Sequence, residues 1–547
     1  MLENPKRIRT KNARETLLRG AQTVFEAVSS TYGPRSANVA IARPYGRPSV
    51  IHDGVGVSRS SLPLQDPEHN VGAEIIFDAA DKTNGIGDGT TLATILTYDL
   101  ASQAHKYISA GARMMSLREG IEQAVEAVTS EVEAASTPVK GVEDILRIAT
   151  VSAQNEEIGK MVADAYEELG SDGILTVDES RNETSSLELK TGMQFDKGWL
   201  DDVFATDGKN REAILEDVHI IITDNRIRDP HGFVGMLQRL FEADVNKVAQ
   251  GAKPPSIMVI ADNFDGEAFA FFKLNHIKKI VHSLAVHAPL FGQKRRDVLR
   301  DIATYTGGTL ISEADGVGWQ SVTKEMLGRA SKVVATKNTT LIVDGQGAEE
   351  DIRMRVSELE EKLNDTDLSA YDREKVSERL AKLRSGVGVL VIGARSESEA
   401  KERRERAIDA VAAARAATLS GIVPGGGITL MRAAQKVREA NKLVASDTDM
   451  RFGFDIVLSA CEAPFRKLLS NAGYDPGEHK ALLGQVEAGK GVDVVTGQIV
   501  DMVEEGIIDP TSVITAALGN AASSASSIYT SNTIITDAPR EQTNERN

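Results

Sequence analysis

Strand patterns are concentrated in the middle of this 547-residue chain, and mainly helical patterns stand both before and after them, with short strand-like pieces around Val39 to Ala42. From about Gly173, short β-branched runs alternate with helical segments at 233–249, 266–279 and 294–305, which indicates an α/β layer. A chain that leaves a helical domain and returns to it crosses between domains twice, and paired crossings make natural hinges. We therefore expect a multidomain α and α/β protein whose helical domain is built from both ends. The expected strands are ILTVD, LELK, HIIITD, SIMVIA, TLIS, KVVAT and TLIVDG.

The far side of the central region is rich in charge. Residues 351–384 carry apolar side chains at helical spacing, which predicts a helical hairpin that turns around 364–370. A strand, GVLVIG, and a long helix from about Ser398 to Leu419 follow. The final segment, DAPREQTNERN, is polar and is predicted to be disordered.

Length and composition limit the class of protein. A chain of 547 residues exceeds a single-core domain, so roughly three domains are expected. The net charge of −17 argues against nucleic acid or an anionic membrane as the main partner, because both reward clustered Lys and Arg. One cysteine, Cys461, excludes an internal disulfide and fits a reducing compartment. With no spanning apolar stretch and no secretory signal pattern, we expect a soluble cytoplasmic protein.

The sequence Gly87-Asp-Gly-Thr-Thr91 carries the sharpest chemical signal. Its glycines let the backbone approach a ligand, and Asp88 can face a metal ion. Thr90 and Thr91 open a helix whose N-terminal amides and dipole favour an anion. This combination suits a magnesium-bound triphosphate. The structural alternative is a glycine-rich loop that caps a buried helix.

Three other loops and one helix also have two interpretations. Thr31-Tyr-Gly-Pro34 reads as a helix C-cap, and it becomes a phosphate cradle only if folding brings it against Gly87–Thr91. His52-Asp-Gly54 and Gly425–Gly427 are tight turns that could also meet a ligand. Asp409 lies in an alanine-rich helix, where Arg406 or Arg415 could pair with it. Its functional interpretation is a carboxylate that orients water for attack on a γ-phosphate.

Two central segments are unusually rich in phenylalanine for a chain with 5% aromatic residues. Such stripes usually belong to a core. Two neighbouring stripes could instead form an exposed apolar groove that holds unfolded chains without sequence specificity, since each buried Phe contributes ~1.5–3 kcal/mol. The segments contain Phe233, Val234, Met236, Leu237, Leu240 and Phe241, and Phe269, Phe271, Phe272, Leu274 and Ile277.

Nine motifs, in this order and spacing, resemble those of the group I chaperonins, the GroEL type, over essentially the whole chain. They are TYGPRSANVAI, HDGVGVSR, GDGTTLATIL, GMQFDKGWL, RRDVLRDIATYTGGTLIS, YDREKVSERLAKL, AIDAVAAARAA, GIVPGGGITL and IIDPT. The resemblance implies a helical equatorial ATPase domain at 1–134 and 420–547, an intermediate hinge domain at 135–190 and 388–419, and an α/β apical domain at 191–387. It also implies heptameric rings, single or double, with a GroES-like co-chaperonin and unfolded polypeptide clients.

The same resemblance assigns roles to individual residues. Asp88 is implied to hold Mg²⁺ and Asp53 to lie beside the attacking water, with K⁺ accompanying the phosphates. Asp409 is implied to swing in and complete hydrolysis, and Lys197 and Glu397 to pair between subunits. The residues implied to bind ATP are Thr31, Tyr32, Gly33, Pro34, His52, Asp88, Gly89, Thr90, Thr91, Leu92, Gly426, Asp493, Val494, Val495 and Asp509. Those implied to bind clients are Trp199, Phe204, Leu237, Leu240, Phe241, Phe269 and Leu274.

Several residues depart from the family pattern around the nucleotide. His52 replaces a lysine, Leu92 replaces a third threonine, and Asp493 replaces an asparagine. These changes leave open a passive holdase or scaffold that has lost productive cycling. A small-molecule kinase is a third interpretation with less support, because the sequence shows no separate pocket for a phosphate acceptor.

Further departures concern the surfaces expected to meet partners. In the apical groove Lys273 occupies a normally apolar position, and Asp201-Asp202 adds charge. Glu478 replaces an apolar residue among positions that match inter-ring contacts, so a single-ring assembly is an alternative to a double ring.

Overall fold

The computed structural model describes residues 6–42, 49–51, 54–170, 173–180, 183–206, 211–228, 230–248, 251–363, 370–384, 386–440, 447–484 and 489–537. The chain divides into two compact units. The first, here called the helical unit, combines residues 1–171, 177–186 and 390–547. The second, the sheet unit, contains residues 172–176 and 187–389. The expected multidomain α and α/β fold, with its helical part built from both ends of the chain, is confirmed.

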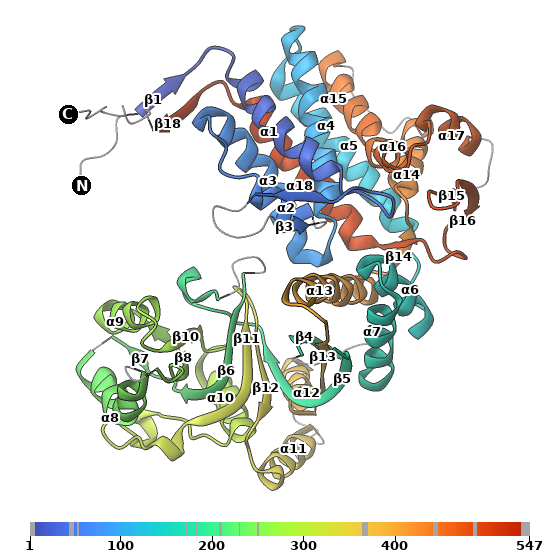
Figure 1. Ribbon diagram of the computed structural model, residues 1–547. Helices are drawn as coiled ribbons and strands as arrows, with labels where there is room; N and C mark the ends of the chain where they lie inside the picture. Colours follow the sequence, from blue (N-terminus) through green and yellow to red (C-terminus); the bar gives the residue numbers. More distant parts are fainter. Residues whose placement is uncertain are drawn as a thin grey trace. The chain divides into compact units, whose positions relative to one another are not determined.

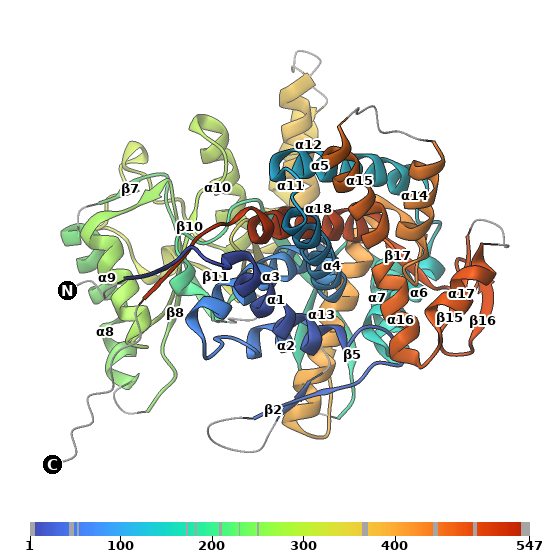
Figure 2. The same ribbon diagram turned by 90° about the horizontal axis from the view of Figure 1, so that it is seen from above.

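Long helices form the core of the helical unit. They are α1 (Ala13–Ser29), α3 (Pro67–Gly87), α4 (Thr90–Ser109), α5 (Met114–Ala134), α14 (Ile428–Glu439), α15 (Thr448–Ala460), α16 (Ala463–Ala472) and α18 (Thr511–Thr530). Helix α18 lies among α3, α4 and α5 (Figure 2). Apolar residues from both ends of the sequence therefore share one core.

Glycines allow two pairs of these helices to touch at the backbone. A Cβ atom at Gly72 of α3 would lie 1.9 Å from the Leu17 carbonyl oxygen of α1. A Cβ atom at Gly120 of α5 would lie 1.9 Å from the Met450 carbonyl oxygen of α15. No side chain fits at such distances, so these crossings require glycine.

A second group of helices in the same unit contains α6 (Val142–Ala153), α7 (Glu156–Leu169) and α13 (Glu397–Ser420). Helix α13 packs on α6 and α7, and also on α3 and α18 of the core. The predicted long helix at 398–419 is therefore correct, and it joins two parts of the helical unit.

Short strands and helices complete the helical unit. β1 (Lys6–Arg9) pairs with β18 (Ile534–Asp537), and β2 (Val39–Ile41) pairs with β3 (Ser49–Ile51). β14 (Ile422–Pro424) pairs with β17 (Ile508–Pro510), and β15 (Lys490–Asp493) with β16 (Gln498–Asp501), all antiparallel. The short helices are α2 (Gly54–Ser60) and α17 (Pro476–Leu483).

An eight-stranded mixed sheet runs in the order β10-β8-β6-β11-β12-β5-β13-β4. Its strands β6, β8 and β10 are parallel, whereas β11, β12 and β5 pair antiparallel. Every residue of β8 is buried, as expected for a strand covered on both faces. The strands are β4 (Ile174–Glu179), β5 (Ser186–Phe195), β6 (Ala213–Ile222), β8 (Ser256–Ala261), β10 (His282–His287), β11 (Gly328–Ala335), β12 (Thr340–Gly345) and β13 (Gly386–Ile392).

Helices α8 (Pro230–Val248) and α9 (Gly266–Ile277) lie side by side in the sheet unit (Figure 1). Near them β7 (Arg226–Ile227) pairs with β9 (Asn263–Phe264). Helix α10 (Gly292–Thr306) contacts the predicted helical hairpin, α11 (Glu349–Leu363) and α12 (Ala370–Arg384). The hairpin is confirmed.

One buried carboxylate ties this hairpin to α10. Asp301 is 1% exposed and accepts from Arg355 of α11 at 2.8 Å and from Arg379 of α12 at 2.5 Å. A carboxylate buried to this degree needs such partners.

Two strand expectations need correction. The segment TLIS forms no strand and contributes only an isolated bridge between Ile311 and Thr223, because it directly follows α10 and turns into a short 3-10 helix. Conversely, β10 was not predicted, since its sequence HSLAVH begins and ends with histidine. Among the described residues, no helix is long and apolar enough to cross a membrane.

Candidate functional site

The turn between α3 and α4 has an unusual backbone. Gly87, Asp88 and Gly89 all have positive φ, at 134°, 93° and 90°. For Asp88 this conformation is strained, so the surrounding packing must hold it. A Cβ atom at Gly89 would lie 2.6 Å from Val513 Cγ1, which leaves no room for a larger residue. The turn thus presents Asp88 next to the N-terminus of α4, which begins at Thr90.

The turn after α1 approaches the same point. Burial raises the pKa of Tyr32, and the nearby carboxylates of Asp509 and Asp88 raise it further. These three residues come from separate parts of the chain, and their electrostatic coupling requires proximity. Folding therefore brings the Thr31–Pro34 turn towards the Gly87–Thr91 turn, which was the condition for a phosphate cradle.

Helix α16 supports the Thr31–Pro34 turn from behind. The Asn471 side-chain amide donates to the carbonyl oxygens of Ser29 and Tyr32, both at 2.9 Å. A Cβ atom at Gly33 would lie 3.0 Å from Leu468 of the same helix. Asn471 was missed in the sequence because nothing in its local pattern predicts a contact with residues more than 400 positions away.

Asp509 and Asp88 form an acidic pair. Asp509 lies on β17 and is half-buried, and burial raises its pKa to about 6, with the Asp88 charge adding to the effect. Two neighbouring carboxylates repel each other until a cation or a proton neutralises them. The described residues hold no group of three or more His, Cys, Asp or Glu side chains suited to a metal. A divalent ion here would therefore need further oxygen ligands from water or phosphate, which is the usual pattern for Mg²⁺.

Helix α13 packs directly against the same turn. A Cβ atom at Gly87 would lie 2.7 Å from the Ala412 carbonyl oxygen and 3.0 Å from Ala416 Cβ. Asp409 is half-buried and precedes Ala412 by three residues, so it lies on the same side of α13. Arg406, its proposed structural partner, donates to the Ala153 carbonyl oxygen at 3.1 Å and bonds Glu402 at 2.9 Å. The helix face that carries Asp409 therefore faces the acidic turn.

The residues expected near a ribose and base lie on loops of the same unit. Gly426 has φ 67° and packs against Met502, which shares an apolar cluster with Val494 and Tyr32. The carboxylate of Asp493 accepts from the Val495 amide at 2.8 Å and from Thr496 Oγ1 at 2.7 Å. Asp493 therefore stabilises its own turn.

The His52–Asp53 turn and Leu92 were also predicted to lie near the nucleotide. His52 and Asp53 lie outside the described residues, but Gly54 follows them, and a Cβ atom there would lie 2.2 Å from Thr91 Oγ1. Leu92 is 4% exposed and belongs to the core of the helical unit. The Leu92 side chain packs in this core and, unlike a threonine, offers no hydroxyl to a ligand.

The expected exposed apolar groove requires correction in the sheet unit. Trp199, Phe204, Leu237 and Phe241 are all less than 9% exposed and belong to the core. Leu240 and Phe269 are half-buried, whereas Leu274 of α9 is 48% exposed. The phenylalanines pack edge-to-face with one another, which the stripe pattern alone could not distinguish from a surface.

Lys197 lies in the sheet unit, where its carbonyl oxygen accepts from Thr340 Oγ1 at 2.7 Å. Glu397 is the first residue of α13. Their pairing between subunits stays a prediction.

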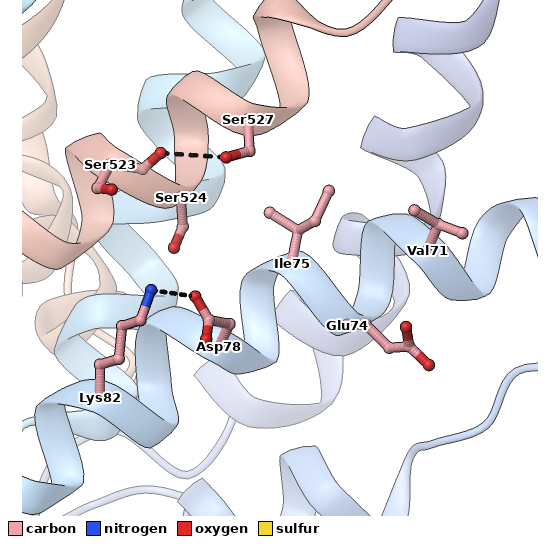
Figure 3. Close-up of a pocket in the computed structure, with 8 residues that line it drawn as sticks. All are labelled: Val71, Glu74, Ile75, Asp78, Lys82, Ser523, Ser524 and Ser527. Carbon is pink, nitrogen blue, oxygen red and sulfur yellow. Dashed lines mark hydrogen bonds and ion pairs between the residues drawn. The ribbon is translucent and has the colours of Figure 1, made fainter. Parts of the chain in front are cut away.

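A cavity of about 250 Å³ lies elsewhere in the helical unit, between α3 and α18 (Figure 3). An ion pair between Lys82 and Asp78, 2.6 Å long, lies at its edge. None of the predicted site residues lines it. Its lining is Val71, Glu74, Ile75, Asp78, Lys82, Ser523, Ser524 and Ser527.

Comparison with known proteins adds independent information. Solved structures of the chaperonin gp146 from the bacteriophage EL 2 (Pseudomonas aeruginosa), determined in the presence of ATP-BeFx, are similar over 97% of this chain. Crystal form II has a TM-score of 0.67, 22% identity and 99% of its own chain covered, and form I has 0.61, 22% and 98%. The profile of the TCP-1/cpn60 chaperonin family matches residues 24–539. This chain therefore belongs to the TCP-1/cpn60 chaperonin family.

Proposed function

We propose that the protein is an ATP-dependent chaperonin of group I that binds non-native polypeptides and encloses them for folding. The observation that carries this proposal is the convergence of Tyr32, Asp88 and Asp509 at one turn, with α13 packed against Gly87. Chaperonins of this family are ATPases, and the gp146 structures were determined with an ATP analogue.

The site residues can be assigned roles on this basis. The Gly89–Thr91 amides and hydroxyls at the start of α4 would bind phosphate oxygens. Asp88 would hold Mg²⁺, which supplies charge neutralisation during phosphoryl transfer. Asp409 would orient the attacking water from α13. Asp53 would lie beside the attacking water, and K⁺ would accompany the phosphates.

The domain scheme follows from the same proposal. Residues 1–134 and 420–547 of the helical unit would form the equatorial part. Residues 135–190 and 388–419, most of which belong to the helical unit, would form the intermediate part. Residues 191–387 of the sheet unit would form the apical domain, which meets clients and a GroES-like co-chaperonin. Subunits would assemble into a heptameric ring, single or double, in the cytoplasm.

A passive holdase is the second candidate, and the buried Leu92 in place of a threonine favours it. A holdase would suppress aggregation of a denatured protein without nucleotide and would hydrolyse little ATP. Potassium-dependent ATP hydrolysis, measured together with aggregation, separates the two functions.

The decisive variant is Asp409→Ala. We expect ATP affinity to stay within about threefold of the original while turnover falls by about a hundredfold or more, because the carboxylate acts on the water rather than on the nucleotide. Asp164→Ala, on the exposed side of α7, is the matched control and should leave turnover unchanged. Normal turnover in Asp409→Ala would refute the assigned role.

A further inference from the structure

A short segment of the sheet unit, residues 199–205, lies across α9 and is here called the cover segment. Its Leu200 amide donates to the Ala285 carbonyl oxygen of β10 at 2.9 Å. The Trp199 indole donates to Asp202 at 3.1 Å, and the Asp201 carboxylate accepts from the Val203 amide at 3.0 Å. One end of the segment is thus fixed to the sheet, and the rest forms a 3-10 turn from Asp202 to Phe204.

Phe204 places its ring between the cover segment and α9. It is 0% exposed, and its ring centroid lies 6.0 Å from Phe269 and 6.1 Å from Phe272. The His276 ring meets it edge-on at 5.4 Å. Phe204 therefore covers part of an aromatic face of α9, whose Phe269 and Phe272 rings also pack against Phe264.

An ion pair holds the cover segment to α9. The Lys273 ammonium donates to the Asp201 carboxylate, and it also lies 5.4 Å above the Phe269 ring. Both charged side chains are about one-third exposed, at 30% and 32%. The hydrogen bond from Lys273 lowers the pKa of Asp201, and the Val203 amide and the Lys273 charge add to this effect. Among the described residues, this is the one ion pair that joins the cover segment to α9.

The exposed side of α9 is much smaller than its aromatic side. Leu274 and Ile277 are 48% and 57% exposed and lie one helical turn apart. Release of the cover segment would add Phe204 and the parts of Phe269 and Phe272 that it contacts.

We propose that the Lys273–Asp201 pair keeps the cover segment closed, so that α9 offers clients only a small aliphatic surface until the pair opens. The proposal rests on the proposed client binding and concerns its regulation. Opening requires the loss of one partly exposed pair, the release of one 3-10 turn and the exposure of the buried Phe204 ring. The backbone bond of Leu200 to β10 and the bonds of Thr206 to Glu212 and Ile214 can remain.

The expected size of the effect follows from the exposure of the pair. A partly exposed ion pair changes an equilibrium by about two- to fivefold. High salt should open the segment by a similar factor, because screening weakens exposed charges.

The test uses the full-length protein with Asp201→Asn or Lys273→Met. Asparagine keeps an acceptor for the Val203 amide, and methionine keeps the apolar stem of lysine. Hydrogen exchange in a peptide covering residues 199–206 reports opening directly, because the Phe204 and Ala205 amides donate to Asp201 and Asp202 carbonyl oxygens. We expect about two- to fivefold faster exchange in each variant, no further increase in the double variant, and more capture of a chemically denatured model protein.

Lys278→Met is the matched control. Lys278 is exposed at the end of α9, so the substitution adds the same apolar group without touching the pair. Unchanged exchange in both test variants, or an equal increase in the control, overturns the proposal. Faster exchange with no capture by any form, the original included, supports the cover and refutes client binding instead.

Discussion

The acidic pair at the candidate nucleotide site makes a quantitative prediction for Asp509→Asn. Burial and the Asp88 charge raise the pKa of Asp509 from 3.8 to about 6. The folded protein therefore holds this proton more tightly than the unfolded chain does, and ionisation of Asp509 opposes folding above pH 6. A shift of about two units corresponds to roughly 3 kcal/mol, since each unit is worth about 1.36 kcal/mol.

The free-energy penalty for ionising Asp509 in the folded protein depends on pH. The penalty is absent below pH 3.8, grows as the pH rises from 3.8 to about 6, and is complete above pH 6. Asparagine cannot ionise, so Asp509→Asn should raise the unfolding free energy of the nucleotide-free protein at pH 7.5 by up to about 3 kcal/mol. About half of that gain should be lost at pH 5.

Urea unfolding at pH 5 and pH 7.5, followed by circular dichroism, measures this difference. Asp164→Asn, an exposed carboxylate on α7, is the control and should change neither midpoint. Added Mg²⁺-nucleotide should stabilise the original protein more than the variant, because a cation relieves the repulsion only where both carboxylates are present. An Asp509→Asn protein no more stable than the original at pH 7.5 would refute the repulsion that we infer.

Two further predictions concern residues that the sequence did not single out. Asn471→Ala removes both bonds to the Ser29 and Tyr32 carbonyl oxygens, so we expect about tenfold weaker ATP binding by calorimetry with turnover of bound ATP nearly unchanged; equal losses in both would contradict a positioning role. Asp301→Asn leaves the buried Arg379 and the half-buried Arg355 without their shared carboxylate and should lower the unfolding free energy by about 3–5 kcal/mol in denaturant titration. Asp297→Asn, whose carboxylate lies 3.6 Å from Arg379, should cost less, and similar losses would contradict the special role of Asp301.

Local pattern was sufficient for the elements that repeat a clear period. The α11–α12 hairpin was predicted from apolar residues at helical spacing, the long helix α13 was predicted at about 398–419, and both lie where expected. The segment TLIS has a strand composition, but it comes directly after α10 and forms only one bridge. Composition sets a preference for strands, whereas pairing depends on the neighbouring chain.

The candidate site divides in the same way. Asp88 and its glycines could be recognised from sequence, because positive φ values and a helix start demand specific residues. Asn471 could not, since its amide acts on carbonyl oxygens that any residue would supply. The burial of Phe204 was also invisible, because a phenylalanine in a core and one in a groove have the same local sequence.

Because β1 pairs antiparallel with β18, each of these two strands depends on the other for its backbone partners. Lys6 and Asp537 are register partners, as are Arg9 and Ile534. A protease that trims residues 534–537 would therefore also deprive the first strand of its backbone partners, and loss of 6–9 would do the same to the last. Loss of either strand should thus destabilise the other, although the two lie at opposite ends of the sequence.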